Sequence, residues 1–530
     1  MPVPLLNDDV LRQILSYLWK RDALNVALCS RHLYDLALPR VAAIAATGSP
    51  TSLHRLWAYM LSGTPPHAQY LEDLSITLTT FDCPDYDDYW DFSQAPLIGD
   101  LLLAAQRLRQ IAFERFDPCV EADPRIGEAL YSMDRLVSAE FGTVADSTFE
   151  LLPGLNKNLR ALQLMYFWEQ DEPLEDETKT FPPLLDALSP LHYLNTLGLV
   201  YFDPPDGSLS GSADRHLFRL PSIRTLTFSL SSASALELVD VCPNVTRIDF
   251  LSARLDPGDK LCDGPSWPPL RALTLGGYPE AKCVAHRVGA VDKLAISSNI
   301  KVGTADEPEQ VADLLALLVR ASPVNLSLRV SLQATPMTFW GRVAHLAPRL
   351  RMLELRVSLE VLAVENIGWL DSIPASLSAL PLIYLSIAVP KNPTVQQPSD
   401  SIGEVLECAA SDEQHYLDAR EIEVHRAQAL EALPKRLMNA IPTLRFVSIG
   451  SGEVNKDNLA GCPAGRPAGP PHKGPDPSWF HMYVDEKMEK KHWRISGGGD
   501  FRVLQEMSER EAARLCAGAD AGQVEELLRL

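Results

Sequence analysis

Residues 159–164 read Leu-Arg-Ala-Leu-Gln-Leu, and this pattern decides the fold because it recurs through most of the chain. An apolar residue is followed three positions later by a second one, and a third lies two positions beyond it. In a short β-strand alternate side chains point to opposite faces, so Leu162 and Leu164 should enter a core while Gln163 faces outward. Further copies, including a weaker one at 326, begin at residues 71, 108, 194, 223, 245, 270, 291, 350, 382 and 444.

Helical segments are predicted between these strands, for example at residues 101–108, 235–241, 311–320 and 427–438, with a longer helical insertion at 401–426. The copies are spaced from about 21 residues to the high thirties, which is typical of leucine-rich repeats loosened by insertions. The alternation predicts an α/β fold, a curved solenoid of short parallel strands and helices. The alternative is an ordinary α/β domain with a doubly wound sheet, which fits so many short strands less well.

The first 41 residues predict three short helices with more apolar surface than they can bury. Val10, Ile14 and Leu18 form one stripe at helical spacing, to which Leu15 also belongs. Asp22 and Ser30 are expected to cap the second and third helices, and Pro39 to help end the third. A segment below about 40 residues rarely stabilises itself without a metal, disulfides or a partner. Its surplus apolar surface therefore points to another protein.

This segment also carries a recognisable motif. An acidic helix start is followed by Val10-Leu11, then by the runs at residues 14–18, 21–24 and 27–34. On these residues it resembles an F-box, and it is particularly similar to the F-boxes of fungal proteins. The family usually has Leu-Pro where this chain has Leu6-Asn7, but Asn is a good helix N-cap.

The resemblance implies a three-helix module that binds the Skp-family adaptor of cullin-RING ubiquitin ligases and, through it, a cullin. The alternative is that these helices only cap the end of the repeats, as terminal segments of repeat proteins often do. The adaptor contacts implied by the resemblance are Pro4, Leu5, Leu6, Asp9, Val10, Ile14, Leu15, Leu18, Leu24, Ala27, Leu28, Cys29, Leu33 and Tyr34.

Four segments are expected along the chain: an F-box at 1–45, a leucine-rich-repeat solenoid at 46–460, a Pro/Gly-rich linker at 461–477 and a C-terminal hairpin and helix at 478–530. In the last segment, residues 479–484 and 493–495 are predicted to pair as strands. The helix that follows at 503–516 is predicted to cap the open end of the solenoid.

The residues that alternate with the core positions of the strands should form an outward surface. We interpret this surface as the one that binds an unidentified client protein. The chain would then be the substrate-recognition subunit of a Skp–cullin–F-box ubiquitin ligase. The alternative is a repeat scaffold with an F-box-like helical cap and no ligase role. The predicted client-binding residues are Gln163, Thr225, Arg247, Asp249, Lys293, Glu354 and Tyr384.

Composition and motif searches exclude several other functions. The net charge of −21 disfavours non-specific binding to nucleic acids. The nine scattered cysteines form no Cys-x-x-Cys pair, and no signal segment or bilayer-spanning apolar run is present. No catalytic motif is found, so a non-enzymatic cytoplasmic or nuclear protein without metal or cofactor is expected. The acidic segments at 82–91 and 169–177 are predicted to be solvated loops.

Two sets of substitutions would test these expectations. Leu15→Asp together with Leu18→Asp is expected to eliminate adaptor binding while the repeats stay folded. Replacing Arg247, Lys293 and Tyr384 together is expected to abolish client binding without affecting the adaptor.

Overall fold

The computed structural model describes residues 7–81, 90–166, 184–203, 219–253, 266–300, 307–331, 337–358, 368–390, 409–452, 489–498 and 501–520. The chain forms two compact units, Met1–Val245 and Thr246–Leu530, which we call unit 1 and unit 2. The linker predicted at 461–477, the predicted strand at 479–484 and the acidic segment at 169–177 lie outside the described residues.

Unit 1 begins with three helices, α1 (Asp8–Tyr17), α2 (Lys20–Ala27) and α3 (Arg31–Ala42). The Asn7 side chain accepts a hydrogen bond from the Asp9 N–H at 3.2 Å, and Ser30 accepts one from the Leu33 N–H at 3.2 Å, so both act as N-caps. Asp22 does not cap α2, because the helix begins two residues earlier, at Lys20, with Trp19 at its N-cap. Pro39 does not end α3 either. It lies inside the helix at an exposed position, where water can satisfy the carbonyl it leaves unpaired.

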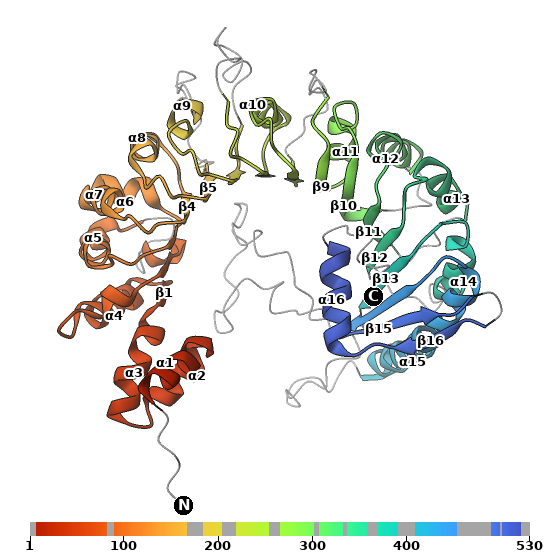
Figure 1. Ribbon diagram of the computed structural model, residues 1–530, viewed down its shortest axis with the longest axis horizontal. Coiled ribbons are helices and arrows are strands. Elements are labelled where there is room, and N and C mark those ends of the chain that lie inside the picture. Colours follow the sequence, from red (N-terminus) through yellow and green to blue (C-terminus); the bar gives the residue numbers. More distant parts are fainter. Residues whose placement is uncertain are drawn as a thin grey trace, which may run out of the picture. The chain divides into compact units, whose positions relative to one another are not determined.

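The seven strands of unit 1 are parallel, and each pairs with the next in chain order. Figure 1 shows the helices that follow them along one face of the strands. The strands are β1 (Ile44–Thr47), β2 (Asp73–Ile76), β3 (Gln110–Phe113), β4 (Ser138–Gly142), β5 (Ala161–Met165), β6 (Thr196–Val200) and β7 (Thr225–Ser229). The α-helices are α4 (Pro50–Leu61), α5 (Ala95–Ala104), α6 (Phe116–Ala122), α7 (Arg125–Ser132), α8 (Asp146–Leu151), α9 (Leu184–Leu188) and α10 (Leu238–Val241). The 3-10 helices are η1 (His67–Tyr70), η2 (Leu78–Phe81), η3 (Phe92–Gln94), η4 (Leu152–Gly154) and η6 (Ala233–Glu237).

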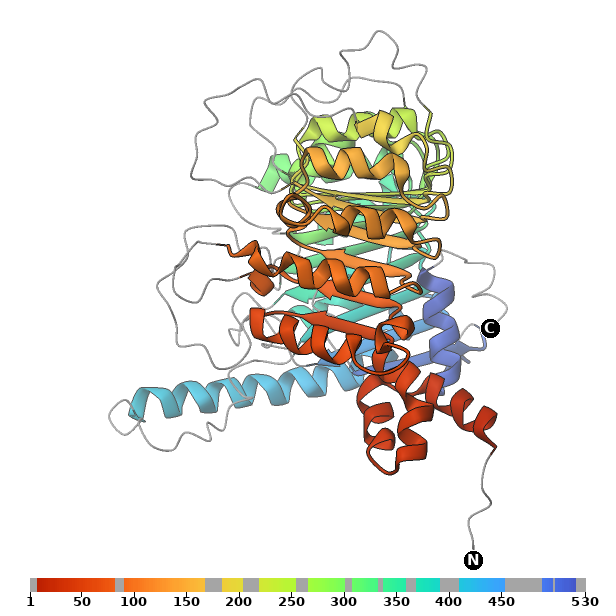
Figure 2. The same cartoon turned by 90° about the vertical axis from the view of Figure 1, so that its left-hand side faces the viewer.

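Unit 2 continues the alternation with seven parallel strands and then reverses direction. β15 pairs antiparallel with β14, and β16 pairs antiparallel with β15. Figure 2 shows the long helix α15 extending past the strands. The strands are β8 (Arg247–Leu251), β9 (Leu270–Leu275), β10 (Val291–Ile300), β11 (Asn325–Ser331), β12 (Met352–Ser358), β13 (Tyr384–Pro390), β14 (Phe446–Gly452), β15 (Glu489–Ser496) and β16 (Val503–Glu506). The helices are α11 (Tyr278–Val284), α12 (Glu307–Ala321), α13 (Met337–Leu346), α14 (Gly368–Leu377), α15 (Ala409–Ala440) and α16 (Glu509–Asp520).

The repeated apolar pattern accounts for most of these strands. Leu162 pairs with Leu197 and Leu197 with Leu226 in register, and all three are at most 1% exposed. Fully burying each such side chain contributes about 1.5–3 kcal/mol. The prediction of an α/β fold with parallel strands alternating with helices is therefore confirmed. The pattern missed β1 and β4, because Ala45 and Ala139 stand where a leucine was sought.

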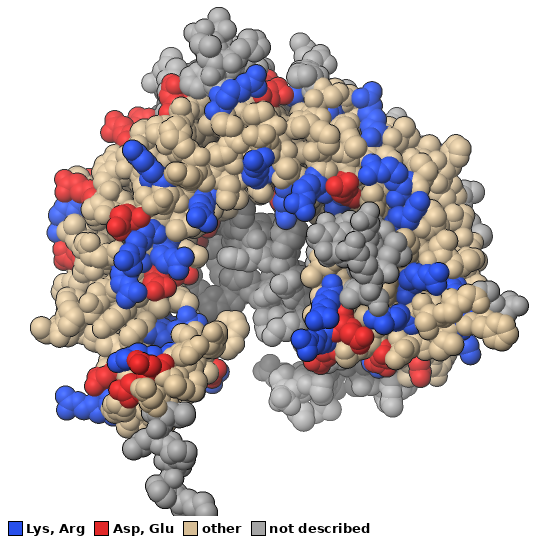
Figure 3. All heavy atoms as spheres, in the orientation of Figure 1, with Lys and Arg blue, Asp and Glu red and all other residues tan. Residues whose placement is uncertain are grey.

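In unit 1, arginines directly precede alternate strands, and their backbone N–H groups extend the hydrogen-bonded ladder between the strands. The Arg160 N–H donates to the Val137 carbonyl at 2.8 Å, directly before β5 begins. The Arg224 side chain also donates from Nη1 to the Asn244 carbonyl at 3.1 Å, which satisfies an orphan acceptor in a turn. Figure 3 shows Lys and Arg side chains at intervals across the face turned to the viewer. The hydrogen bond to the Asn244 carbonyl gives the Arg224 side chain a structural contact within unit 1.

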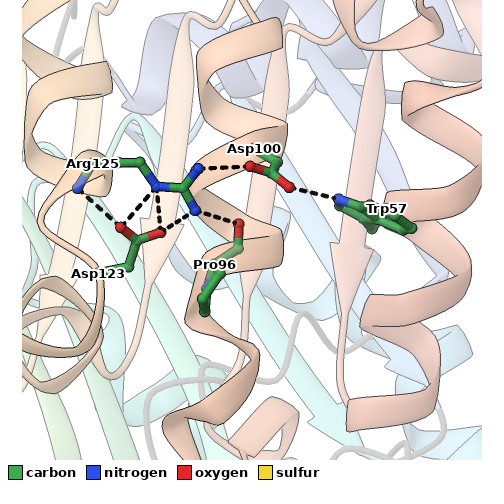
Figure 4. A network of polar contacts seen from close by, with 5 residues as sticks. All are labelled: Trp57, Pro96, Asp100, Asp123 and Arg125. Carbon is green, nitrogen blue, oxygen red and sulfur yellow. Dashed lines mark hydrogen bonds and ion pairs between the residues drawn. The ribbon is translucent and has the colours of Figure 1, made fainter.

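A partly exposed polar network links α4, α5 and α7 (Figure 4). Arg125 forms ion pairs with Asp100 and with Asp123, each at 2.8 Å, and donates to the Pro96 carbonyl at 3.3 Å. Trp57 donates from its indole N–H to Asp100 at 3.4 Å. Because the partners come from α4, α5, the residue after α6 and α7, this network ties neighbouring parts of the helical layer in unit 1 to one another.

Gly99 is the position in α5 that lets this network close. A Cβ at Gly99 would lie 2.4 Å from Asp123 Oδ2, which is closer than real Cβ contacts. We expect Gly99→Ala to lower the free energy of unfolding by about 1–3 kcal/mol, the usual cost of overpacking. Urea denaturation measures this change. Gly341→Ala in α13 is the matched control, since nothing lies within 4 Å of its Cβ and the exchange should be neutral or stabilising. Equal effects of the two substitutions would contradict the steric explanation.

The same network predicts a pH dependence. Hydrogen bonds from Arg125 hold the pKa of the Asp123 carboxyl below its usual value. A lowered folded-state pKa stabilises the fold above the unfolded-state value of about 3.9, and this stabilisation is lost as the pH falls through the folded-state pKa. We therefore expect Arg125→Gln to lower the Tm at pH 7, and the difference from wild type to shrink below about pH 4. A Tm difference that stays constant down to pH 3 would argue against this role of the ion pair.

Candidate functional site

The largest concentration of exposed apolar side chains lies on α1 and α2. Among the described residues, fourteen large hydrophobic side chains are exposed, and six of them fall between residues 10 and 28. Tyr17 and Trp19 are each 80% exposed and Leu28 is 76% exposed. Single exposed apolar residues are ordinary, but a concentration of them in one small module is typical of a binding surface. We call this set the apolar patch; it consists of Val10, Ile14, Tyr17, Trp19, Leu24 and Leu28.

The apolar patch exists because α1 and α2 are apolar on two faces. In α1, Leu15 is buried and the partly buried Leu11 and Leu18 pack on the same core. Val10, Ile14 and Tyr17 recur at i, i+4 and i+7 and are exposed, so they lie on a different face of the helix.

The second helix repeats this division. Ala23 and Ala27 are buried against α3, while Leu24 and Leu28, four residues apart, remain exposed. Small alanines let the helices approach closely, and the adjacent leucines are 41% and 76% exposed.

Polar contacts fix the patch relative to the rest of unit 1. Lys20 Nζ donates to the Ile44 carbonyl at 2.6 Å, and Arg40 Nε donates to the Leu18 carbonyl at 2.9 Å. Partial burial lowers the pKa of Lys20. On the other side of the module, His32 lies 3.1 Å from Asp8 and so links α3 to the start of α1. The three helices therefore present a defined surface, not a loose hairpin.

The structure places the predicted adaptor contacts in several different environments. Val10, Ile14, Leu24 and Leu28 belong to the apolar patch, and Asp9 and Cys29 are exposed beside it. Leu18, Leu33 and Tyr34 are only partly exposed. Pro4, Leu5 and Leu6 lie outside the described residues.

Two of the predicted contacts need correction. Leu15 and Ala27 are each 3% exposed and form part of the core of the three helices. An aspartate at position 15 would place a carboxylate in this core, so Leu15→Asp with Leu18→Asp would remove the fold of the module along with any binding. The pattern also missed Tyr17 and Trp19, the most exposed members of the patch. Tyr17 lies three residues after Ile14, a spacing that could have placed it on the same helix face.

The predicted client-binding residues belong to both units, each described by itself. In unit 1, Gln163 donates to Glu140 at 2.8 Å, and Thr225 is half-buried. In unit 2, Arg247 pairs with Asp249 at 2.8 Å. Lys293 pairs with Glu354 at 3.7 Å. Asp249 is well buried in the first ion pair, and both side chains are partly buried in the second.

Tyr384 is a correction, because α16 covers it. This side chain is 4% exposed and forms a cluster with Met352, Phe446, Leu515 and Ala519. Burial raises its pKa. Tyr384 is therefore part of an intramolecular contact and is not available on an open surface. The proposed replacement of Arg247, Lys293 and Tyr384 together would disturb this packing.

The structure also corrects the helix predicted at 503–516, because residues 503–506 form β16 and α16 begins at Glu509. Figure 1 shows α16 on the opposite side of the strands from α11–α14. Its Ala519 carbonyl accepts a hydrogen bond from the buried Asn325 side chain at 3.0 Å, and Glu511 pairs with Arg494 at 3.4 Å. Met352, Tyr384 and Phe446 are register neighbours on β12, β13 and β14, so they form a continuous apolar stripe. This stripe attracts the helix onto the face of the sheet.

Within the described part of the chain, no group of three or more His, Cys, Asp or Glu side chains could hold a metal ion. Burial raises the pKa of the Cys242 thiol to about 12, which keeps it unreactive near neutral pH. No helix in the described ranges is long and apolar enough to cross a membrane.

Comparison with known proteins gave similarity to solved structures alone. No family model matches the chain, and no curated protein matches it in sequence. Among solved structures, it is similar to a chain in the crystal structure of the Rad7 and Elc1 complex from yeast. The identity is 13%, the TM-score is 0.31, and the match covers 72% of this chain and 88% of that chain. A similarity of this size carries no inference about function.

Proposed function

We propose that this chain is a substrate-recognition subunit of a Skp–cullin–F-box ubiquitin ligase. The observation that carries the proposal is the apolar patch, which lies within the segment that resembles an F-box. Fully burying each of its side chains would contribute about 1.5–3 kcal/mol. Association entropy consumes much of this sum, but six such side chains leave room for a stable complex.

The patch also distinguishes this proposal from a role as a helical cap. A cap buries its apolar residues against the repeats that it covers. The module does contact the first strand, through Lys20 and the Ile44 carbonyl. The six side chains of the patch, however, are exposed in the described structure, which favours binding of another protein over capping.

The proposed mechanism is proximity. The F-box module would dock on the Skp-family adaptor, the adaptor would bring the cullin, and the repeats would hold a client protein near a loaded conjugating enzyme. Holding two reactants together converts a bimolecular step into an effectively unimolecular one. The chain itself would then need no catalytic group, and it would act in the cytoplasm or nucleus, where such ligases work.

Co-purification tests the proposal directly. The full chain is co-expressed with a Skp-family adaptor, purified through a tag on the chain and analysed by gel filtration. We expect both proteins to elute together and a cullin to join only when the adaptor is present. A chain that elutes alone at micromolar concentrations of adaptor would contradict the ligase role and favour a repeat scaffold.

A further inference from the structure

Two arginines stand side by side on the outward face of unit 2. Arg329 on β11 alternates with the buried Leu328 and Val330, and Arg356 on β12 alternates with its buried neighbours in the same way. The two strands are parallel, and their register places Arg329 directly opposite Arg356. Both side chains are exposed. Adjacent strands lie about 4.8 Å apart, so the two guanidinium groups extend from neighbouring positions into solvent.

This arrangement is unfavourable without a counter-charge, because like charges directly opposite each other destabilise a sheet. Within the described ranges, neither arginine has a hydrogen-bond or ion-pair partner. Glu354, two residues before Arg356 on the same strand, is already engaged, since it pairs with Lys293. In a chain with a net charge of −21, this arginine pair is a local concentration of positive charge. An anionic group of a binding partner would be attracted to it.

A third basic residue lies on the same row of the sheet. The register runs from Arg356 through Ala388 and Gly450 to Lys490 on β15. Lys490 is exposed, and its charge contributes to the lowered pKa of the neighbouring His492, for which burial is the main cause. Since partners in register point to the same face, the row carries positive charge at both ends.

The helix α16 leaves the arginine pair uncovered. Its contact with β11 is at Asn325, four residues before Arg329, which corresponds to about 13 Å along the strand. Its apolar contact with β12 is at Met352, four residues before Arg356. The pair therefore lies beyond the stripe that α16 occupies.

We propose that Arg329 and Arg356 form a binding site for an oxyanion group of a client segment, a phosphorylated side chain or a carboxylate. This proposal rests on the client-binding role stated above. Guanidinium groups bind both oxyanions through paired, charge-assisted hydrogen bonds. A phosphoryl group is the better match, because its charge of about −1.5 to −2 can neutralise both arginines at once.

Peptide binding to the full chain tests this site. The probes are fluorescent short peptides with a central phosphoserine between randomised flanking residues, and matched pools with serine or glutamate at the centre. We expect the wild-type chain to prefer the phosphoserine pool over the serine pool in fluorescence anisotropy. Arg329→Gln with Arg356→Gln should weaken this binding by about tenfold or more.

Arg342→Gln with Lys435→Gln is the matched control, because it removes the same charge from exposed helical positions of unit 2. Binding equal to wild type in this control supports the site. Equal loss in both double variants would mean non-specific attraction and would overturn the proposal, as would equal binding of the serine pool. If the glutamate pool binds as well as phosphoserine, the site stands with a carboxylate as its ligand.

The Tm of the double arginine variant shows whether a loss of peptide binding comes from a lost site or from a lost fold. Removing the repulsion between the two arginines should leave the Tm of the double variant equal to or above that of wild type. A lowered Tm would show that the pair is structural and would overturn the proposal. Peptide binding and Tm are measured without the adaptor. If the chain binds the adaptor but shows no preference for phosphoserine, the anion site is wrong and the ligase role stands. If the chain prefers phosphoserine but does not bind the adaptor, the anion site stands and the ligase role is wrong.

Discussion

Replacing Ile14 and Leu28 with aspartate is expected to abolish binding of the Skp-family adaptor while the three N-terminal helices stay folded. Both side chains are exposed, at 45% and 76%, so the substitutions do not enter the core formed by Leu15 and its neighbours. Losing the burial of two large apolar side chains removes about 3–6 kcal/mol from the interface. This corresponds to a loss of affinity of about two to four orders of magnitude. Isothermal titration with purified adaptor measures the loss, and circular dichroism checks the helices.

The matched control places the same charges on apolar residues that are exposed elsewhere. Leu103 on α5 and Val319 on α12 are 44% and 52% exposed and lie far from the patch in sequence. Leu103→Asp with Val319→Asp should leave adaptor affinity unchanged. If the adaptor binds the Ile14, Leu28 variant as tightly as wild type, the apolar patch is not its docking surface.

Leu515→Asp is expected to release α16 from the face of unit 2 and to lower the stability of that unit. Leu515 is fully buried against the stripe of Met352, Tyr384 and Phe446. Truncating such a leucine costs about 2–5 kcal/mol, and an aspartate adds the cost of a buried charge. We expect a lower midpoint of urea denaturation and faster cleavage near α16 in limited proteolysis.

Ala513→Asp provides the control for this helix, because Ala513 is exposed two residues earlier in α16. It introduces the same charge without touching the stripe. Its denaturation midpoint should stay close to that of wild type. Equal destabilisation by both substitutions would show that helix propensity, and not contact with the sheet, accounts for the effect.

The strands could be predicted from sequence because their signal is local. Leu162 and Leu164 sit two residues apart in the same strand, and their alternation is visible without any tertiary information. The leucine pattern is absent at β1 and β4, where Ala45 and Ala139 fill core positions. A small residue is accepted there because its neighbours in the stack supply the remaining volume, and that compensation is invisible in a single repeat.

The division of the candidate site into core and surface was less predictable. Val10, Ile14 and Leu15 all read as one apolar stripe, yet only Leu15 is buried. Helix α1 is apolar on two faces, and packing against α2 and α3 decides which of them is covered. The resemblance to an F-box identified the segment, but geometry was needed to assign each residue.

Contacts between residues far apart in the chain could not be predicted from the sequence. Met352, Tyr384 and Phe446 come from strands far apart in the chain, and only their register reveals that they form one stripe. Nothing local in α16 indicates that it lies on this stripe, since Leu515 and Ala519 are common helical residues. Tyr384 was therefore assigned to an open surface that the chain itself occupies.

The antiparallel strand β15 has a further consequence for handling this protein. It satisfies the hydrogen-bonding edge of β14, along which residues 446–451 pair with residues 489–494. A chain shortened to end before Glu489 would leave that edge unpaired and would uncover Met352, Tyr384 and Phe446 at the same time. Unpaired edges and contiguous apolar surfaces both promote self-association. The C-terminal segment thus protects unit 2 against aggregation, and shortened forms should become insoluble even though every parallel repeat is retained.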